Sequence, residues 1–193
     1  MERDIEILKK REEQKKEKYQ TLEDGIYLDG RILNFERKVV LNTFTMLIPD
    51  TMKQMPKEYA RIKYPSEFRP QQIFTTSDLD VNMGFTVFSK QIQQEDRMEL
   101  LQQMQETVYR ANQDGKQNAC VLLKQVSGGY FTFRSYIMDS DLFQMMALIT
   151  VGEWLIQGNF HCVYSEHIKW KRIVLLMLET IQILEKEEDT DKI

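Results

Sequence analysis

The sequence has few cysteines and no long apolar run. Its two cysteines, Cys120 and Cys162, form no CxxC pair, so the chain can build neither a disulfide framework nor a four-ligand zinc site. No window holds about 18 consecutive apolar residues, and the start of the chain lacks the apolar centre of a secretory signal. We therefore expect a reduced, cytoplasmic protein without a membrane span.

An excess of charge of one sign is also missing. Lys and Arg number 26 against 30 Asp and Glu, which gives a formal net charge of -4. A nucleic-acid-binding surface needs an excess of basic charge, so this balance argues against a nucleic-acid partner.

The common catalytic and nucleotide-binding motifs are absent as well. The chain contains no G-x-G-x-x-G, G-x-x-x-x-G-K-[ST], H-E-x-x-H or G-x-S-x-G. The sequence therefore predicts no cofactor, no metal site and no enzyme. A motif search does not detect catalytic residues that come together from distant parts of the chain.

What is present suggests one domain with a charged extension at each end. The chain has 193 residues, and its 42% apolar content suffices for one core. Residues 1–24 mix acidic and basic side chains and predict a helical arm, which we expect to be dispensable for folding and available for self-association. Residues 25–187 form the predicted domain, and residues 188–193 a frayed tail.

Apolar periodicity predicts the elements of this domain. Alternation indicates a strand at 44–48 and paired strands at 72–76 and 81–89. Helical spacing predicts a short helix that starts at Pro56 and longer helices at 95–111 and 168–184. Strands at 119–126, 130–138, 142–151 and 154–164 should form an antiparallel meander. Two of its turns are expected at Gly128-Gly129 and Gly152-Glu153.

Polar residues near the strand ends are the first candidates for chemistry. His161 and Cys162 are adjacent in a strand and point to opposite faces, so we expect a buried thiol and a solvated histidine. Asp139 and Asp141 flank Ser140 at a strand end. There they would serve acid-base chemistry or bind a cation, or they would hydrogen-bond the turn backbone.

An aromatic strand is the second candidate. Tyr130, Arg134 and Tyr136 share one face, and Phe131 and Phe133 lie on the other. Aromatic side chains beside a cation on a sheet are typical of single-stranded RNA binding. Because the chain is acidic overall, we favour the simpler interpretation that Phe131 and Phe133 belong to the core.

The order of predicted elements resembles the Mog1/PsbP-like superfamily. Ile48-Pro49-Asp50, the segment 64–70, the segment 158–162 and Trp170 also resemble small uncharacterised Firmicutes proteins of that fold. The resemblance covers about residues 26–186. It implies an α+β fold, an α/β/α sandwich in which a central antiparallel sheet of about six to seven strands is flanked by helices. It further implies protein partners and no catalytic residues.

These observations predict a non-catalytic protein-interaction module, such as an accessory or chaperone of a secretion system. Eleven methionines suit an adaptable apolar surface, but methionine also fills cores, and we favour that simpler role. The alternative is a small-ligand binder or enzyme with a polar pocket around Arg69, Asp139 and His161. The residues expected at the interaction surface or pocket are Arg69, Tyr130, Arg134, Tyr136, Asp139 and His161.

Gly158 supports a prediction about packing. Gly158 lies in a predicted strand, where glycine often marks a close approach of another element. We expect that element to be the C-terminal helix near Trp170.

Overall fold

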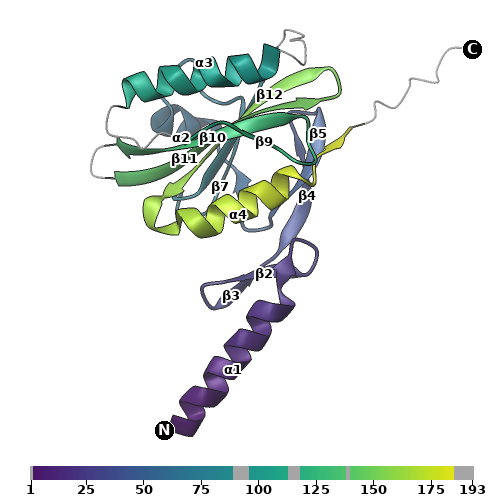
Figure 1. Cartoon of the computed structure of the whole chain (residues 1–193), viewed down its shortest axis with the longest axis vertical. Coiled ribbons are helices and arrows are strands. Elements are labelled where there is room, and N and C mark those ends of the chain that lie inside the picture. Colours follow the sequence, from purple (N-terminus) through teal and green to yellow (C-terminus); the bar gives the residue numbers. More distant parts are fainter. Residues whose placement is uncertain (1, 89–95, 113–117, 138–139, 185–193) are drawn as a thin grey trace, which may run out of the picture.

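A seven-stranded antiparallel sheet forms the centre of the computed structural model, which describes residues 2–88, 96–112, 118–137 and 140–184 (Figure 1). Its strand order is β6-β7-β8-β12-β11-β10-β9. The strands are β6 (Lys53–Gln54), β7 (Gln72–Thr75), β8 (Asn82–Phe88), β9 (Val121–Leu122), β10 (Gly128–Ile137), β11 (Ser140–Val151) and β12 (Trp154–Val163). The predicted meander is confirmed as β9 to β12, with a first strand of only two residues.

Two glycine turns were predicted, and one is confirmed. Gly152 lies in the turn that joins β11 to β12. Its φ of 59° is the positive value that a tight hairpin requires at its first central position. The prediction of a turn at Gly128-Gly129 is wrong, because both glycines lie inside β10 and pair with β11. A Cβ at Gly128 would lie 2.2 Å from the Leu148 carbonyl oxygen. This glycine therefore permits close approach of two strands, and the turn falls earlier.

Helices cover both faces of the sheet, as the predicted sandwich requires (Figure 1). Helix α3 (Asp96–Ala111) packs over Phe131 and Phe133, and Leu101 is its buried residue. Helix α4 (His167–Leu178) packs on the opposite face through Trp170, Ile173 and other buried residues. A second sheet, ordered β13-β5-β4, lies on the α4 side and consists of β4 (Phe35–Val40), β5 (Phe44–Pro49) and β13 (Gln182–Ile183).

The last helix ends earlier than its apolar spacing predicted. The pattern indicated a helix over 168–184, but α4 ends at Leu178, and Gln182 and Ile183 pair with β5. The Thr180 hydroxyl donates to the Met177 carbonyl at 2.7 Å and accepts from the Leu47 amide at 2.9 Å. These contacts turn the chain onto the edge of the second sheet.

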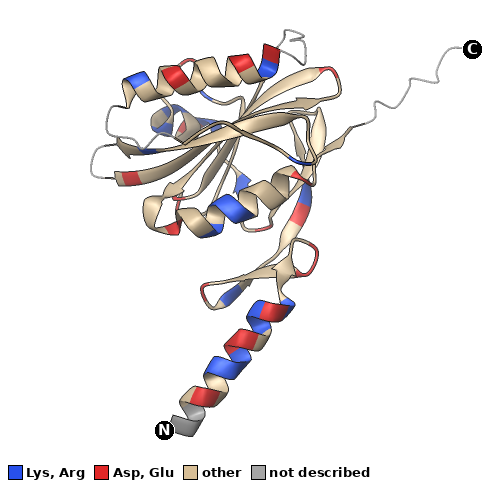
Figure 2. Ribbon diagram, viewed as in Figure 1, with Lys and Arg blue, Asp and Glu red and all other residues tan. Residues whose placement is uncertain are grey.

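The N-terminal part contains a projecting helix and three short strands. Helix α1 (Glu2–Lys18) extends away from the body, and acidic and basic residues are distributed around it (Figures 1 and 2). Strands β1 (Gln20–Thr21), β2 (Gly25–Leu28) and β3 (Arg31–Leu33) form a small sheet between α1 and the body (Figure 1). The helical arm was predicted, whereas the strands at 20–40 were not. Helix α2 (Lys57–Lys63) follows Pro56, as predicted.

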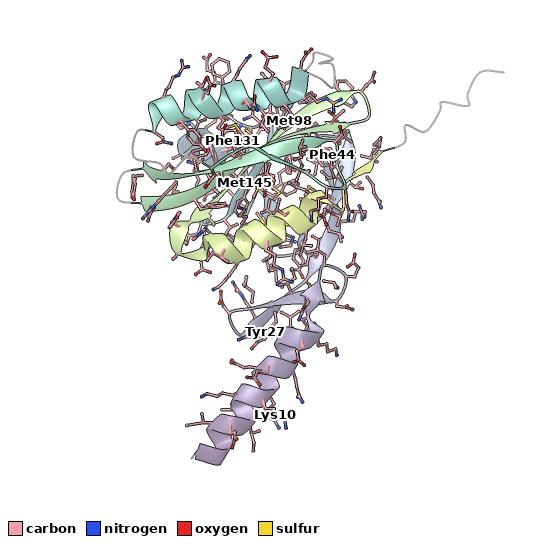
Figure 3. All side chains as sticks on the ribbon, viewed as in Figure 1. Lys10, Tyr27, Phe44, Met98, Phe131 and Met145 are labelled. Atoms are coloured by element: carbon pink, nitrogen blue, oxygen red, sulfur yellow. The ribbon has the colours of Figure 1, made fainter. Side chains whose placement is uncertain are left out.

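Six of the eleven methionines lie buried in the body of the protein, and Figure 3 labels one of them. Met145, labelled in that view, is buried, as are five others: Met46, Met52, Met55, Met83 and Met177. For these six, the core-filling role that we favoured is confirmed, and they do not line a binding surface. Five of them belong to the core that also contains residues of the central sheet, α4 and β5, where unbranched side chains fill irregular space: Met46, Met52, Met83, Met145 and Met177.

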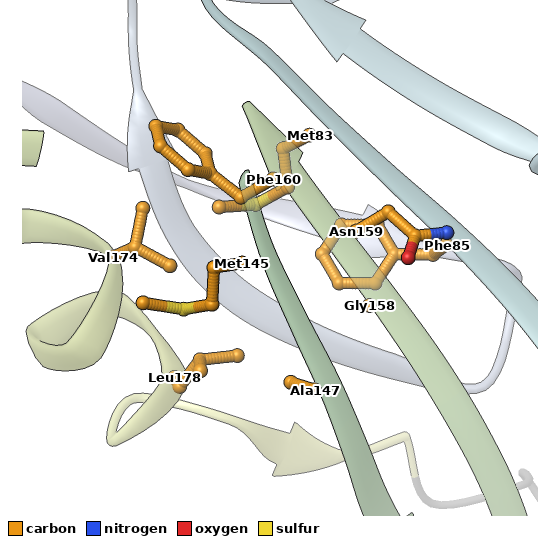
Figure 4. Close-up of a pocket in the computed structure, with 9 residues that line it drawn as sticks. All are labelled: Met83, Phe85, Met145, Ala147, Gly158, Asn159, Phe160, Val174 and Leu178. Carbon is orange, nitrogen blue, oxygen red and sulfur yellow. The ribbon is translucent and has the colours of Figure 1, made fainter. Parts of the chain in front are cut away.

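Gly158 does not lie against Trp170. A Cβ there would lie 3.6 Å from Phe85 and 3.9 Å from the Ala147 Cβ, which is ordinary contact. Figure 4 shows a small apolar hollow around this glycine, between the sheet and α4, with Met145 and Val174 in its wall. The predicted collision with the helix is wrong because a narrow space separates the two elements.

Candidate functional site

Strand β10 carries three of the predicted site residues. Strand alternation puts Tyr130, Arg134 and Tyr136 on the α4 face and Phe131 and Phe133 beneath α3, as predicted. Tyr130 is buried, whereas 55% of the Tyr136 surface is exposed. Near its C-terminal end, β10 thus presents the guanidinium of Arg134 and the exposed phenol of Tyr136.

Arg134 is held by a carboxylate on the neighbouring strand. Its Nε donates to Oδ1 of Asp141 at 2.7 Å, and its Nη2 donates to Oδ2 at 2.5 Å. The register pairs Asp141 with Tyr136, so Arg134 reaches it diagonally. The hydrogen bonds from Arg134 hold the pKa of Asp141 below its usual value. This two-point pair fixes the plane of the guanidinium.

Aromatic rings pack around that guanidinium. Its central carbon lies 4.1 Å from the ring centroid of Tyr164 and 5.1 Å from that of Tyr136. The Tyr164 ring in turn stacks on His167 at 4.4 Å. His167 Nδ1 lies 2.6 Å from the Tyr164 carbonyl oxygen. Because a carbonyl only accepts, Nδ1 carries a proton and donates it to this bond.

A hollow of about 360 Å³ opens beside these groups, between β10 and the first turns of α4. Asn118, Thr132 and Lys171 complete its polar lining. The Lys171 ammonium lies 5.8 Å from the Tyr130 ring centroid and, among the described residues, forms no ion pair. We call Arg134, Tyr136, Tyr164, His167 and Lys171 the cationic cluster. Its N–H donors suit a carboxylate or another acidic group.

His161 lies in a second hollow, which has a volume of about 460 Å³. The expectation that it is solvated is wrong, because its side chain is half-buried against Tyr64, the residue that follows α2: its Nε2 lies 3.3 Å from the Tyr64 hydroxyl. Burial, together with the nearby Lys63 cation, lowers the pKa of His161 to about 4, and burial raises that of Tyr64. The imidazole is therefore neutral at pH 7.

The remaining candidates do not share that hollow. Arg69 donates from Nη1 to the Tyr64 carbonyl at 3.2 Å and lines a different hollow beside α2. Asp139 lies outside the described residues. Of the three residues predicted to form a polar pocket, the two that are described therefore line separate hollows.

Cys162 has the predicted structural role. It is fully buried in the core, and burial raises the pKa of its thiol to about 12. In the described part of the chain, no three His, Cys, Asp or Glu side chains gather in a way that could hold a metal ion. None of the described helices is long and apolar enough to cross a membrane.

Sequence reasoning missed two surface features. Tyr164, His167 and Lys171 carry no local signal for a site, because only the packing of α4 brings them to Arg134. The second feature lies on and beside α2, where Tyr59, Ile62 and Phe68 are strongly exposed.

Comparisons with known proteins identify the fold alone. No family model and no curated protein matches the sequence. The fold resembles that of PsbP (CyanoP) from Synechocystis sp. PCC 6803, with a TM-score of 0.54 and 13% identity over 83% of this chain and 98% of that one. LpqN, involved in cell envelope biogenesis of Mycobacterium tuberculosis, gives a TM-score of 0.54 and 11% identity over 86% of this chain and 99% of that one. The chain has the Mog1/PsbP-like fold.

Proposed function

We propose that this chain is a non-catalytic protein-interaction module and that it binds its partner at the cationic cluster. The observation that carries the proposal is the hollow beside β10, where Lys171 faces a polar lining on an accessible edge of the sheet. Charged donors around an accessible hollow suit an acidic side chain of another protein. Arg134 is held in position by Asp141 and Tyr164, so it reorders little on binding.

Site-specific photo-crosslinking in the source cell tests this proposal. A photoreactive phenylalanine derivative replaces Tyr136 in one form of the full chain and Tyr59 in the other. Both tyrosines are 55% exposed, which makes Tyr59 on α2 a matched control. We expect a discrete protein adduct from position 136 only, and its loss when Lys171→Glu is added. The same adducts from both positions, or none from position 136, would contradict the proposal.

The finer role is also proposed here. An accessory or chaperone of a secretion system, acting in the cytoplasm, agrees with the sequence resemblance and with the paucity of cysteine. Identification of the adduct decides it: a secreted protein or a component of a secretion apparatus supports this role, and any other partner contradicts it. Self-association through the projecting helix α1 is a separate proposal, tested by sedimentation of the full chain over a range of concentrations.

One observation favours a second function, binding of a small polar ligand. The hollow at His161 joins a neutral imidazole and the Tyr64 hydroxyl with Lys63 and Gln144. Such convergent polar groups are typical of ligand sites. Native mass spectrometry of the purified chain tests this function. A co-purifying small molecule that is lost in His161→Gln and retained in His167→Gln supports it, and a ligand-free chain contradicts it.

A further inference from the structure

The outer edge of β10 is covered along only part of its length. Strand β9 pairs with Gly129 and Tyr130 alone. The Thr150 amide donates to the Ser127 carbonyl at 2.8 Å, and the Leu123 amide donates to the Gly128 carbonyl at 3.0 Å. Because backbone groups alternate in direction along an antiparallel strand, odd-numbered residues of β10 bond to β11 and even-numbered ones face the outer edge.

Beyond Tyr130, β9 no longer pairs with β10. At Thr132, side chains from other segments supply the hydrogen bonds that a neighbouring strand would make. The Thr132 carbonyl accepts from the Tyr109 hydroxyl and from the Asn118 amide, both at 3.3 Å. For the outward backbone groups of Arg134 and Tyr136, no partner is found among the residues that the structure describes. Within the described ranges, these two residues thus present backbone donors and acceptors without a partner, at the spacing of a strand edge.

The Arg134 side chain borders the hollow of the cationic cluster, and Tyr136 packs against its guanidinium. An added strand would carry alternate side chains over the α4 face, beside Arg134 and toward Lys171. The ion pair with Asp141 already neutralises Arg134, so Lys171 is the cation left for a new carboxylate.

We propose that the edge of β10 at Arg134 and Tyr136 binds an extended segment of a partner protein as an added antiparallel strand, with an acidic side chain of that segment directed at Lys171. This inference rests on the proposed function, because it specifies how the partner binds. The antiparallel direction follows β9, which occupies the same edge. A second copy of the chain is a poorer occupant, because it would bring a second Lys171 to the edge and juxtapose like charges.

The test uses the full chain and a nine-residue peptide of alternating valine and glutamate. In antiparallel pairing, a glutamate opposite Arg134 directs both its side chain to the α4 face and its amide to β10. Methylation of the glutamate amides therefore blocks pairing, whereas methylation of the valine amides leaves it intact. The two methylated peptides have the same charge and composition and so form a matched pair.

Amide chemical shifts in nuclear magnetic resonance spectra locate the peptide and give its affinity. We expect shifts at the Arg134 and Tyr136 amides, and about tenfold weaker binding when the glutamate amides are methylated. Methylation of the valine amides should change the affinity little. The Lys171→Glu variant should bind the valine-glutamate peptide more weakly than the native chain does. It should instead bind a peptide in which lysine replaces glutamate. Lys171→Ala serves as a second variant, and the unchanged spectrum of the core confirms that each variant is folded.

Other outcomes overturn the inference. Equal affinity of the two methylated peptides, or shifts confined to another surface, would show that the edge does not accept a strand. Shifts at Arg134 and Tyr136 that grow with protein concentration without peptide would identify a second copy as the occupant. If the adduct at position 136 forms in cells while the methylated peptides bind equally, the interaction function stands and this binding mode fails.

Discussion

Arg134 and Asp141 join neighbouring strands through two hydrogen bonds, of 2.7 Å and 2.5 Å, and the same guanidinium lies over Tyr164. The pair gives the edge of the sheet a fixed cation whose charge is already matched. A ligand at this edge therefore meets an ordered surface whose net positive charge comes from Lys171.

Arg134→Gln should raise the pKa of Asp141 toward its usual value. In the native chain the hydrogen bonds from Arg134 lower that pKa, and glutamine supplies no positive charge. The measurement is a pH titration of the Asp141 carboxyl carbon by nuclear magnetic resonance. An unchanged midpoint would show that the pair does not form in solution. Asp78, whose pKa is lowered chiefly by its hydrogen bond from Thr76, is the internal control and should not change.

His161 should make the chain less stable as the pH falls from about 6.5 toward 4. Its folded-state pKa is about 4, below that of an exposed histidine, so in this range the unfolded chain takes up a proton that the folded chain does not. The free energy of unfolding should fall by up to about 1.4 kcal/mol per pH unit from this group. His161→Gln should flatten the dependence measured by urea unfolding. A curve with the native slope would contradict the half-buried, neutral imidazole of His161, and His167→Gln serves as the control.

Gly128→Ala should be strongly destabilising, by about 3 kcal/mol or more. The new Cβ would lie 2.2 Å from the Leu148 carbonyl oxygen and 2.8 Å from the Ile149 Cα, both of which are backbone atoms of β11. Gly30→Ala is the control, because Gly30 has a φ of 83° with no heavy atom within 4 Å of a Cβ. Its backbone conformation alone should cost about 1–2 kcal/mol. Equal losses in urea unfolding would contradict the register of β10 and β11.

Gly158→Ala should stabilise the chain by about 0.5–1 kcal/mol. The added methyl would make ordinary contact with Phe85 at 3.6 Å and enter the small apolar hollow of Figure 4. Alanine also leaves the unfolded chain less conformational freedom than glycine. Urea unfolding measures the change in the free energy of unfolding. A loss of stability would show that neighbouring side chains fill the hollow in solution and leave no space for the methyl group.

Local patterns predicted most of the elements, because alternation and helical spacing record which face of each element is buried. Phe44, Met46 and Ile48 alternate into the core, as the pattern indicated. Patterns failed where one local signal fits two structures. Ile181 continues the helical spacing, yet the chain beyond α4 forms an edge strand, and Gly128 fits a turn as well as a close strand contact.

The candidate site was less predictable, since it depends on long-range packing. Tyr130, Arg134 and Tyr136 were grouped from strand alternation alone. Their neighbour Tyr164 comes from the segment before α4, and Lys171 comes from the start of α4. Only the fold brings these two residues to β10. The environment of His161 likewise depends on Tyr64, which lies far away in the sequence.

Amide hydrogen exchange along β10 tests the open edge most directly. Phe133 and Ser135 direct their amides to β11, whereas those of Arg134 and Tyr136 face outward. We predict slow exchange at Phe133 and Ser135 and fast exchange at Arg134 and Tyr136 in the free full-length chain. Equally slow exchange at all four amides would show that the edge is already occupied, and would contradict this account of how a partner binds.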